Sequence, residues 1–139
     1  MTFQARLRGR SVQVLRPSKG GTGPNRWHTL IRIPVGARRR SLRPVAGKSQ
    51  LGLEYVWIAA GKTFKVRMHD PDPSVRPTAT NPLPNALMGW TVRISRGRQF
   101  MDDRGVFHAR GKVSPRSDEF EEFIANETHI PIFPPTNYP

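Results

Sequence analysis

The 139-residue sequence contains no cysteine, and this absence excludes disulfides, thiolate metal sites and a cysteine nucleophile. No apolar run approaches the roughly 20 residues that a membrane-spanning helix needs. The opening residues lack the apolar core of a signal peptide, so nothing in them directs export by the general route. A Walker-type phosphate loop, a GxSxG motif and the cysteine-containing signature of zinc deaminases are also missing, which excludes the enzyme classes that depend on them.

Acidic residues are absent from the first 53 positions, although those positions carry twelve Lys and Arg, including the run Arg38, Arg39 and Arg40. All ten Asp and Glu and eleven further Lys and Arg follow from Glu54 onward. The net charge of +13 makes a polyanion the expected partner. A membrane-surface helix is disfavoured because several prolines interrupt the basic segment. We therefore expect a nucleic acid rather than a membrane as the main partner.

Proline and glycine are abundant, with fourteen and twelve residues, and they indicate short strands and long loops. The hydrophobic content of 36% is enough for one domain with a buried core. Alternating polar and apolar residues predict the strands, and a serine followed by acidic residues predicts one helix. The expected strands are 11–16, 27–33, 51–59, 63–69, 90–96, 99–101, 106–108 and 129–133, and the expected helix is 118–125, capped by Ser117. We expect a β-rich α+β fold with a mainly antiparallel curved sheet and one short C-terminal helix.

Two pairs of these strands are expected to form β-hairpins. Residues 51–59 and 63–69 flank the turn sequence AAGK, and the later pair flanks a turn in which Gly105 takes a positive φ. Residues 36–50 look like a linker or a charged arm, and 70–88 hold five prolines and predict a long loop. We expect a single domain over 1–139. Within it, 1–50 is a basic segment, either an arm that grips the substrate or a leader, and 51–133 is the catalytic region.

His69 is the first candidate for catalysis. Strand alternation places it on the polar face of its strand with Lys65 and Arg67, and Asp70 follows it directly. An imidazole beside cations suits proton transfer at a phosphodiester, because the histidine moves the proton while the cations hold the phosphate. The alternative is an exposed histidine at the end of a strand, and the sequence alone leaves both open.

Two further histidines have less distinctive surroundings. His129 enters a short apolar strand, where a histidine is as often a hydrogen-bonded core residue as a catalyst. His108 lies on the far strand of the second hairpin, beside Arg110 and Lys112. Both remain candidates for a second proton-transfer group.

A metal site has no specific signature in this sequence. The three histidines from residue 69 onward are far apart and lack HExxH-type spacing, so they do not predict zinc. His69, Asp70 and Asp72 leave a magnesium site open. An aspartate before a proline is more often a turn residue.

Several linked motifs resemble the C-terminal toxin domains of bacterial polymorphic toxin systems. They are EYVWIAAGKTFKVRMHDPDPS, NALMGWTVRISRGRQFMDDRGVFH and NETHIPI, and together they span roughly residues 53–132. The family that they resemble most is polymorphic toxin type 30, whose members are proposed to be RNase toxins. The resemblance implies a bacterial nuclease that is delivered into rival cells, acts in the target-cell cytoplasm and is held inactive at home by an immunity protein. Since that partner would offset a basic active face, we expect it to be acidic.

The resemblance also carries over to the residues within those motifs, which are His69, Asp70, Arg93, Asp102, His108, Thr128 and His129. Together with the residue chemistry, it predicts a metal-independent endoribonuclease without a cofactor, in which the RNA 2′-hydroxyl attacks the adjacent phosphate. The predicted catalytic residues are His69 and His129 as the acid/base pair, His108 as a substitute, and Asp70 and Arg93. The predicted substrate-binding residues are Lys65, Arg67, Arg98, Lys112 and Thr128. The alternatives are a metal-dependent DNase using His69, Asp70 and Asp72, and a nucleic-acid-binding protein without enzymatic activity.

Overall fold

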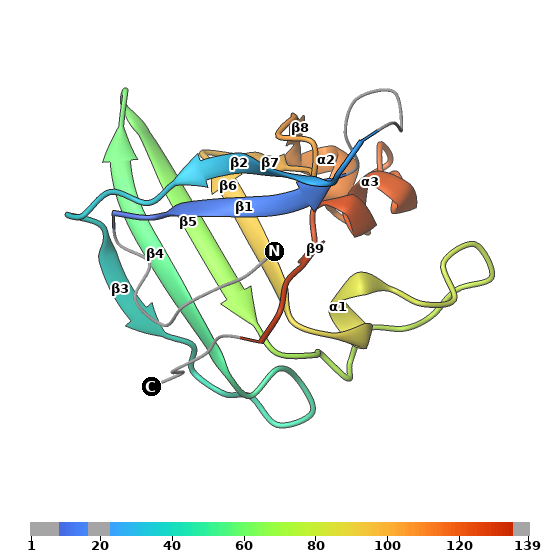
Figure 1. Ribbon diagram of the computed structural model, residues 1–139. Helices are drawn as coiled ribbons and strands as arrows, with labels where there is room; N and C mark the ends of the chain where they lie inside the picture. Colours follow the sequence, from blue (N-terminus) through green and yellow to red (C-terminus); the bar gives the residue numbers. More distant parts are fainter. Residues whose placement is uncertain (1–8, 17–22, 135–139) are drawn as a thin grey trace.

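The computed structural model describes residues 9–16 and 23–134, and a seven-stranded antiparallel sheet lies at its centre (Figure 1). The strand order is β3-β4-β5-β6-β7-β8, and β9 pairs with the beginning of β6. The strands are β3 (Arg38–Ser41), β4 (Gly52–Ala59), β5 (Lys62–His69), β6 (Thr91–Arg96), β7 (Gln99–Met101), β8 (Phe107–Ala109) and β9 (Ile130–Pro131). The expected β-rich α+β class with a mainly antiparallel sheet is confirmed.

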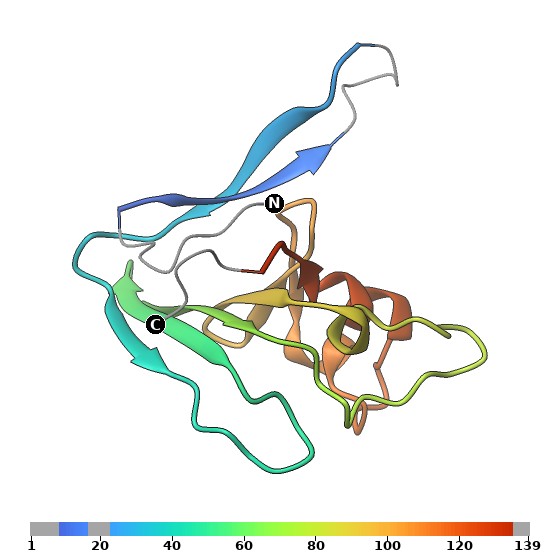
Figure 2. The same ribbon diagram turned by 60° about the horizontal axis from the view of Figure 1, so that its bottom comes forward.

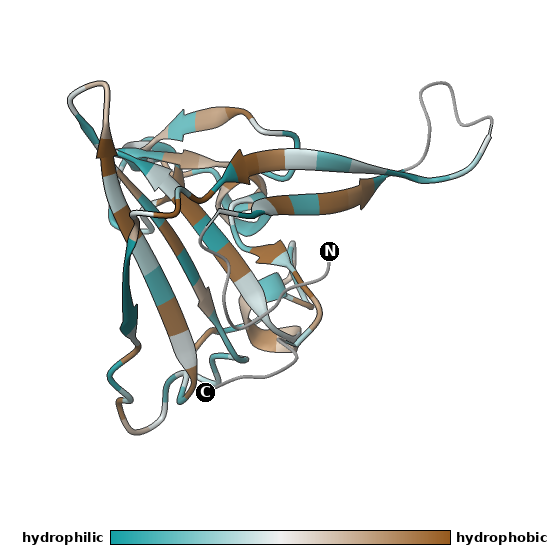
Figure 3. Ribbon diagram, turned by 60° about the vertical axis from the view of Figure 1, so that its left-hand side comes forward, coloured by the Kyte–Doolittle hydropathy of each residue, from teal (hydrophilic) through white to brown (hydrophobic). Residues whose placement is uncertain are grey.

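The hairpin of β4 and β5 fixes which side chains share a face of the sheet. Ala60 and Gly61 form its two-residue turn, with φ angles of 50° and 73°, and positive angles at both positions suit the right-handed twist of a hairpin. In the resulting register Glu54 pairs with Arg67 and Tyr55 with Val66. Polar and apolar side chains therefore point to opposite faces, and they give the colour bands along the strands in Figure 3.

A separate two-stranded sheet covers the apolar face. It consists of β1 (Ser11–Arg16) and β2 (Arg26–Arg32), which pair antiparallel and lie across the larger sheet (Figures 1 and 2). Val12 and Val14 from β1 and Ile33 just after β2 are buried in the same core as the central strands. The buried partners from the large sheet include Leu53, Tyr55, Val66, Met68, Val92 and Ile94. The basic first part of the chain thus contributes to the core.

In the described ranges, three short helices lie on the side of the sheet away from β1 and β2 (Figure 2). They are α1 (Asn85–Met88), α2 (Arg110–Val113) and α3 (Glu122–Glu127). The expected helix over 118–125 is therefore wrong in its bounds. The Ser117 hydroxyl accepts the Glu119 backbone N–H at 3.2 Å within a turn, and the Glu121 N–H donates to the Lys112 carbonyl at 2.9 Å, so the chain turns back to α2 before the helix starts.

The segment expected to be a linker or arm, 36–50, contains a strand of the large sheet. β3 pairs with β4, so that Arg40 lies opposite Glu54 and Arg39 opposite Tyr55. The long loop expected over 70–88 is present but ends in α1, which begins directly after Pro84. The turn at Gly105 has the expected positive φ, 84°. In the described part of the chain, no helix is long and apolar enough to cross a membrane.

Candidate active site

The polar face of the large sheet carries a row of charged residues that crosses four strands. Arg40, Glu54, Arg67 and Arg93 are successive cross-strand partners on β3, β4, β5 and β6. Arg40 donates to Glu54 with a shortest N–O distance of 2.7 Å. Arg67 and Arg93 form no ion pair within residues 9–16 and 23–134. Positive charge is therefore left uncompensated where β5 and β6 meet.

Both predicted acid/base histidines line one cavity on this face. The cavity has a volume of about 230 Å³, and its walls include His69, His129, Arg67 and Arg93. His69 is the last residue of β5, and His129 lies between α3 and β9. The pairing of β9 with the beginning of β6 places His129 next to the strand that carries Arg93. The fold thus brings two histidines and two arginines around a volume suited to a small anionic group.

A hydrogen bond from the His129 ring to the backbone determines which ring nitrogen carries the proton. Nδ1 lies 3.0 Å from the backbone oxygen of Ala125, and because a carbonyl oxygen only accepts, Nδ1 carries the hydrogen. Burial, followed by the positive charge of Arg93, lowers the pKa of His129 from 6.5 to about 4, although the bond to Ala125 opposes the shift. At neutral pH the ring is uncharged and Nε2 has a free lone pair, the state that a general base requires.

His69 is held by its backbone surroundings. Its Nδ1 lies 2.7 Å from the backbone oxygen of Asp70, which again assigns the hydrogen to Nδ1. The buried Ser49 hydroxyl contacts the same nitrogen at 3.0 Å and donates to the Asp70 oxygen at 3.0 Å. Nε2 lies 3.5 Å from the hydroxyl of Thr91, too far for more than a weak contact. Nε2 is therefore the nitrogen that can exchange a proton with a ligand in the cavity.

Arg93 lies at the centre of the polar face. Burial, followed by the charges of Arg67 and Arg110, lowers its pKa from 12.5 to about 10, so it remains a cation at neutral pH. Its guanidinium carbon is 4.0 Å from the centre of the Phe100 ring, which orients it by a cation–π contact. Its buried Nε has no hydrogen-bond partner among the described residues. A desolvated guanidinium with an unused donor and two cationic neighbours is an anion-binding arrangement.

Two adjoining cavities extend the basic surface along the sheet. One, of about 540 Å³, is lined by Lys65 and Arg67 together with Glu54, and the other, of about 280 Å³, is lined by Arg98 and Arg110. Arg93 lines both. The predicted substrate-binding residues Lys65, Arg67 and Arg98 therefore line cavities that share Arg93 with the histidine cavity.

Other predicted residues lie elsewhere or have structural partners. Asp70 Oδ1 accepts the backbone N–H groups of Gln50 and Leu51 at 2.9 and 3.1 Å, which ties the end of β5 to the start of β4. Thr128 is fully buried, and its hydroxyl donates to Ala125 at 2.7 Å. Lys112 donates to Glu121 at 2.9 Å at the surface of α2.

His108 is separate from the two cavity histidines. Its Nε2 is 2.8 Å from Asp102 Oδ2, and Asp102 Oδ1 accepts the backbone N–H groups of Arg104 and Val106 at 2.9 and 3.0 Å. Among the described residues, His108 is absent from the walls of the histidine cavity, of the two adjoining basic cavities and of a fourth cavity that Arg93 also lines. The pair stabilises the turn between β7 and β8.

Two residues of the magnesium alternative, His69 and Asp72, line the histidine cavity, but the side chains of Asp70 and Asp72 accept backbone N–H groups. Asp72 Oδ1 accepts the backbone N–H and the hydroxyl of Ser74 at 2.9 and 2.7 Å, as expected for a turn. Within residues 9–16 and 23–134, no three His, Asp or Glu side chains form a group that could hold a metal ion.

Three residues of the site were not predicted from the sequence. Ser49 lies in the segment expected to be a linker, and no sequence pattern links it to His69. Phe100 and Arg110 approach Arg93 from β7 and α2, through contacts that only the folded chain creates. The position of Glu54, in contrast, can be derived from the sequence, because a two-residue turn at 60–61 places Glu54 opposite Arg67.

Comparison with known proteins gives one match. A family model described as Bacterial toxin 30 matches residues 28–133. The match begins within β2, further toward the N-terminus than the resemblance over about 53–132, and it includes every strand of the large sheet. No curated protein and no solved structure matches the chain.

Proposed function

The chain belongs to the Bacterial toxin 30 family and is a bacterial polymorphic toxin domain, and we propose that it cleaves RNA by metal-independent acid–base catalysis. The proposal is supported by one observation above all: His69 and His129 share a cavity with Arg67 and Arg93. Transfer of an RNA phosphoryl group to the neighbouring 2′-hydroxyl needs two proton-transfer groups and a cationic site for the phosphate. The cavity holds two histidines and two arginines, and the carboxylate of Asp72 also lines it. Among the described residues, neither arginine forms an ion pair.

In the proposed reaction the 2′-oxygen forms a bond to phosphorus, and the bond between phosphorus and the 5′-oxygen breaks. His129 Nε2 takes the proton of the 2′-hydroxyl as general base. His69 Nε2 donates a proton to the departing 5′-oxygen as general acid. The products are a 2′,3′-cyclic phosphate and a 5′-hydroxyl end. Each positioned proton transfer contributes about 10²–10⁴-fold to the rate.

The assignment of His129 as the base follows from its protonation state. Burial and Arg93 keep it neutral, whereas the acid must carry a proton that it can release. A bound phosphodiester offsets the positive charge of Arg93, so the pKa of His129 rises on substrate binding and the ring becomes a better proton acceptor. The site therefore activates its base when the substrate arrives.

The arginines stabilise the charge that gathers on the phosphorane. Arg93 is held by Phe100 at 4.0 Å before the substrate binds, so little reorganisation is needed during the reaction. Loss of one preorganised donor to a developing oxyanion costs about 10²–10³-fold in rate. Arg67, which is exposed on the neighbouring strand, contributes mainly to substrate binding.

The proposal is tested by incubating the purified protein with total RNA and with plasmid DNA, each with and without EDTA. We expect RNA cleavage that persists in EDTA, and loss of at least about 10²-fold in His69→Ala and in His129→Ala. His28→Ala is the matched control, because His28 is an exposed histidine on β2 and outside the cavity. DNA cleavage that EDTA abolishes would instead select the metal-dependent DNase, and salt-sensitive binding without product would select the non-enzymatic protein.

The polymorphic toxin family also supports a delivered effector that meets an immunity partner. We expect that partner to be acidic and to cover the arginines of the polar face, because that face is where positive charge is uncompensated. A competition experiment between RNA and the immunity protein tests this. If the partner covers these arginines, the two should not bind at the same time, and the affinity of each should fall steeply as salt is raised.

A further inference from the structure

A fourth cavity lies beside the histidine cavity and differs from it in chemistry. We infer that this cavity binds the nucleobase of the nucleotide on the 5′ side of the cut, an inference that rests on the proposed ribonuclease activity. It has a volume of about 570 Å³ and lies between the loop 70–84, α1, α2 and α3. Its apolar wall includes Val75, Pro84, Ala86, Val113, Pro115 and Phe120. Such a lining suits the flat apolar faces of a nucleobase better than it suits a phosphate.

The two cavities meet at the proposed base. His129 and Arg93 line both of them. If His129 takes the proton of the 2′-hydroxyl, the ribose that carries this hydroxyl lies against its ring. The nucleobase is attached to the ribose carbon next to the one that bears the hydroxyl, so it points into the adjoining space. That space is the apolar cavity, and the nucleotide concerned is the one that ends as the cyclic phosphate.

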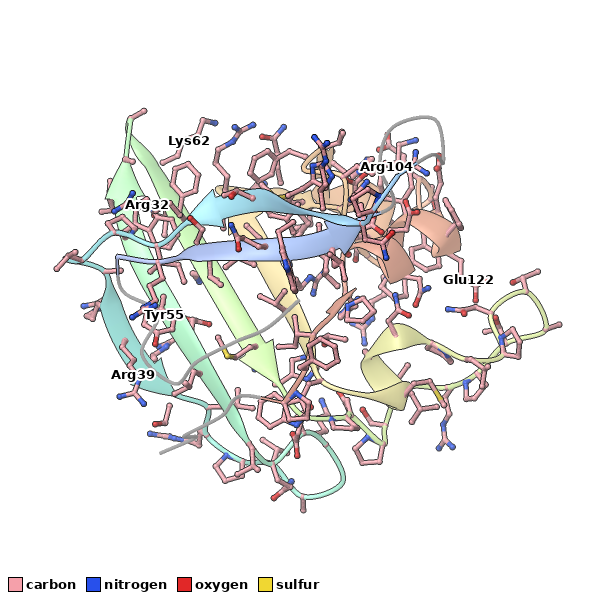
Figure 4. The ribbon with its side chains drawn as sticks, viewed as in Figure 1. Arg32, Arg39, Tyr55, Lys62, Arg104 and Glu122 are labelled. Carbon is pink, nitrogen blue, oxygen red and sulfur yellow. The ribbon has the colours of Figure 1, made fainter. Side chains whose placement is uncertain are left out.

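Polar contacts hold the wall of this cavity in place. The carboxylate of Glu122, in the first turn of α3, accepts hydrogen bonds from the hydroxyls of Thr78 and Thr80, and Figure 4 shows Glu122 beside the proline-rich loop. The Asn85 N–H donates to Asn126 Oδ1 at 2.9 Å, and the Asn85 side chain donates to the Asn126 carbonyl at 3.1 Å. The loop, α1 and α3 therefore form a pocket that exists before a ligand binds.

Two side chains in the pocket are suited to contact a base. Phe120 is half-buried in the pocket wall, and in the described part of the chain its ring makes no aromatic or cation–π contact, so it can offer a face for stacking. Asn126 uses its oxygen for Asn85, and within the same described ranges its side-chain nitrogen donates to no residue. This nitrogen can donate to an acceptor on the edge of the base.

The test is to map the cut sites on a random-sequence RNA pool by sequencing the 3′ ends. We expect the wild-type protein to favour one base on the 5′ side of the cut by about tenfold, since a base-edge hydrogen bond discriminates on that scale. Asn126→Asp keeps the oxygen that accepts from Asn85 but removes both donors, so it should abolish or change that preference. Phe120→Leu keeps an apolar wall but should reduce the preference by removing the stacking ring.

Preference is measured as a ratio between sites, so a general loss of affinity does not alter it. Arg98→Gln is the matched control, because it should lower cleavage of all sequences alike. Cleavage with no base preference on the 5′ side, or a preference unchanged in both Asn126→Asp and Phe120→Leu, would overturn the pocket while leaving the ribonuclease intact. If no RNA is cleaved under any condition, the proposed activity itself fails. A circular dichroism spectrum of each variant confirms that it is folded.

Discussion

Arg93 and His129 are electrostatically coupled, and this coupling gives a quantitative test in the variant Arg93→Gln. The pKa of His129 is lowered from 6.5 to about 4, with burial as the larger cause and Arg93 as the second. Removing the charge of Arg93 takes away only the second cause. We therefore expect the pKa of His129 to rise in the variant but to remain below 6.5, because the ring is still buried.

Two measurements detect this change. An NMR titration of the imidazole protons reports the pKa of His129 directly and needs no substrate. The acidic limb of the kcat/KM profile reports the same group in the free enzyme, so it should lie near pH 4 in the wild type and at higher pH in Arg93→Gln. The plateau rate should fall by about 10²–10³-fold, since the variant also loses a donor to the phosphorane.

Lys62→Gln is the control for this comparison, because it removes a cation at the far end of β5 without touching the cavity. Its titration should match that of the wild type. A pKa of His129 that does not move in Arg93→Gln, or that moves down, would refute the coupling. It would also mean that a bound phosphate, by offsetting the charge of Arg93, does not raise the pKa of His129.

Three further predictions address stability and substrate binding. The folded state disfavours protonated His129, whereas the unfolded state binds the proton with an ordinary pKa, so stability is complete above about pH 6.5 and falls as pH drops towards 4. The free energy of unfolding should fall by at most about 3 kcal/mol between pH 7 and pH 4. Chemical denaturation at the two pH values measures this fall, which should be smaller in His129→Asn. Ser49→Ala should lower kcat by about tenfold with little change in KM, because the Ser49 hydroxyl holds the His69 ring in position; Ser49→Thr should restore the rate, and equal loss in both variants would contradict this role. Glu54→Gln should tighten RNA binding and steepen its salt dependence, since Arg40 and Arg67 lose a nearby negative charge; fluorescence anisotropy across salt concentrations measures it, and unchanged binding would exclude Glu54 from the substrate surface.

Local patterns in the sequence predicted the central hairpin and its faces. In 63–69, alternation separates Val66 and Met68 from Arg67 and His69, and in the structure the first two are fully buried while the others face the cavity. The short turn at Ala60 and Gly61 fixes the register with β4. These features depend only on residues close in sequence, which explains why they can be derived without a structure.

The convergence of His69 and His129 depends on contacts between distant parts of the chain. It requires β9 to pair with the beginning of β6 and the loop 70–84 to be tied to α3. No periodicity predicts those contacts. The error over 118–125 has a similar cause, because the acidic residues there suit a helix start, but the Glu121 N–H is used by α2. Local propensity was overridden by a tertiary hydrogen bond.

The basic first part of the chain belongs to the same sheet and core as the rest, although its charge is different. The charge step at Glu54 suggested a boundary, yet Arg40 and Glu54 are cross-strand partners in one sheet. Val12, Val14 and Ile33 lie in the common core. The step in charge therefore coincides with a strand pairing inside the sheet, and the sequence could not distinguish this from a junction.

The chemistry of the cleaved ends tests the catalytic role of the two histidines most directly. A short RNA is incubated with the wild-type protein in EDTA, and the products are identified by mass spectrometry. Fragments ending in 2′,3′-cyclic phosphate, paired with 5′-hydroxyl fragments and absent with His69→Ala or His129→Ala, are the predicted result. Fragments with 5′-phosphate and 3′-hydroxyl ends, or unchanged cleavage by both histidine variants, would contradict it.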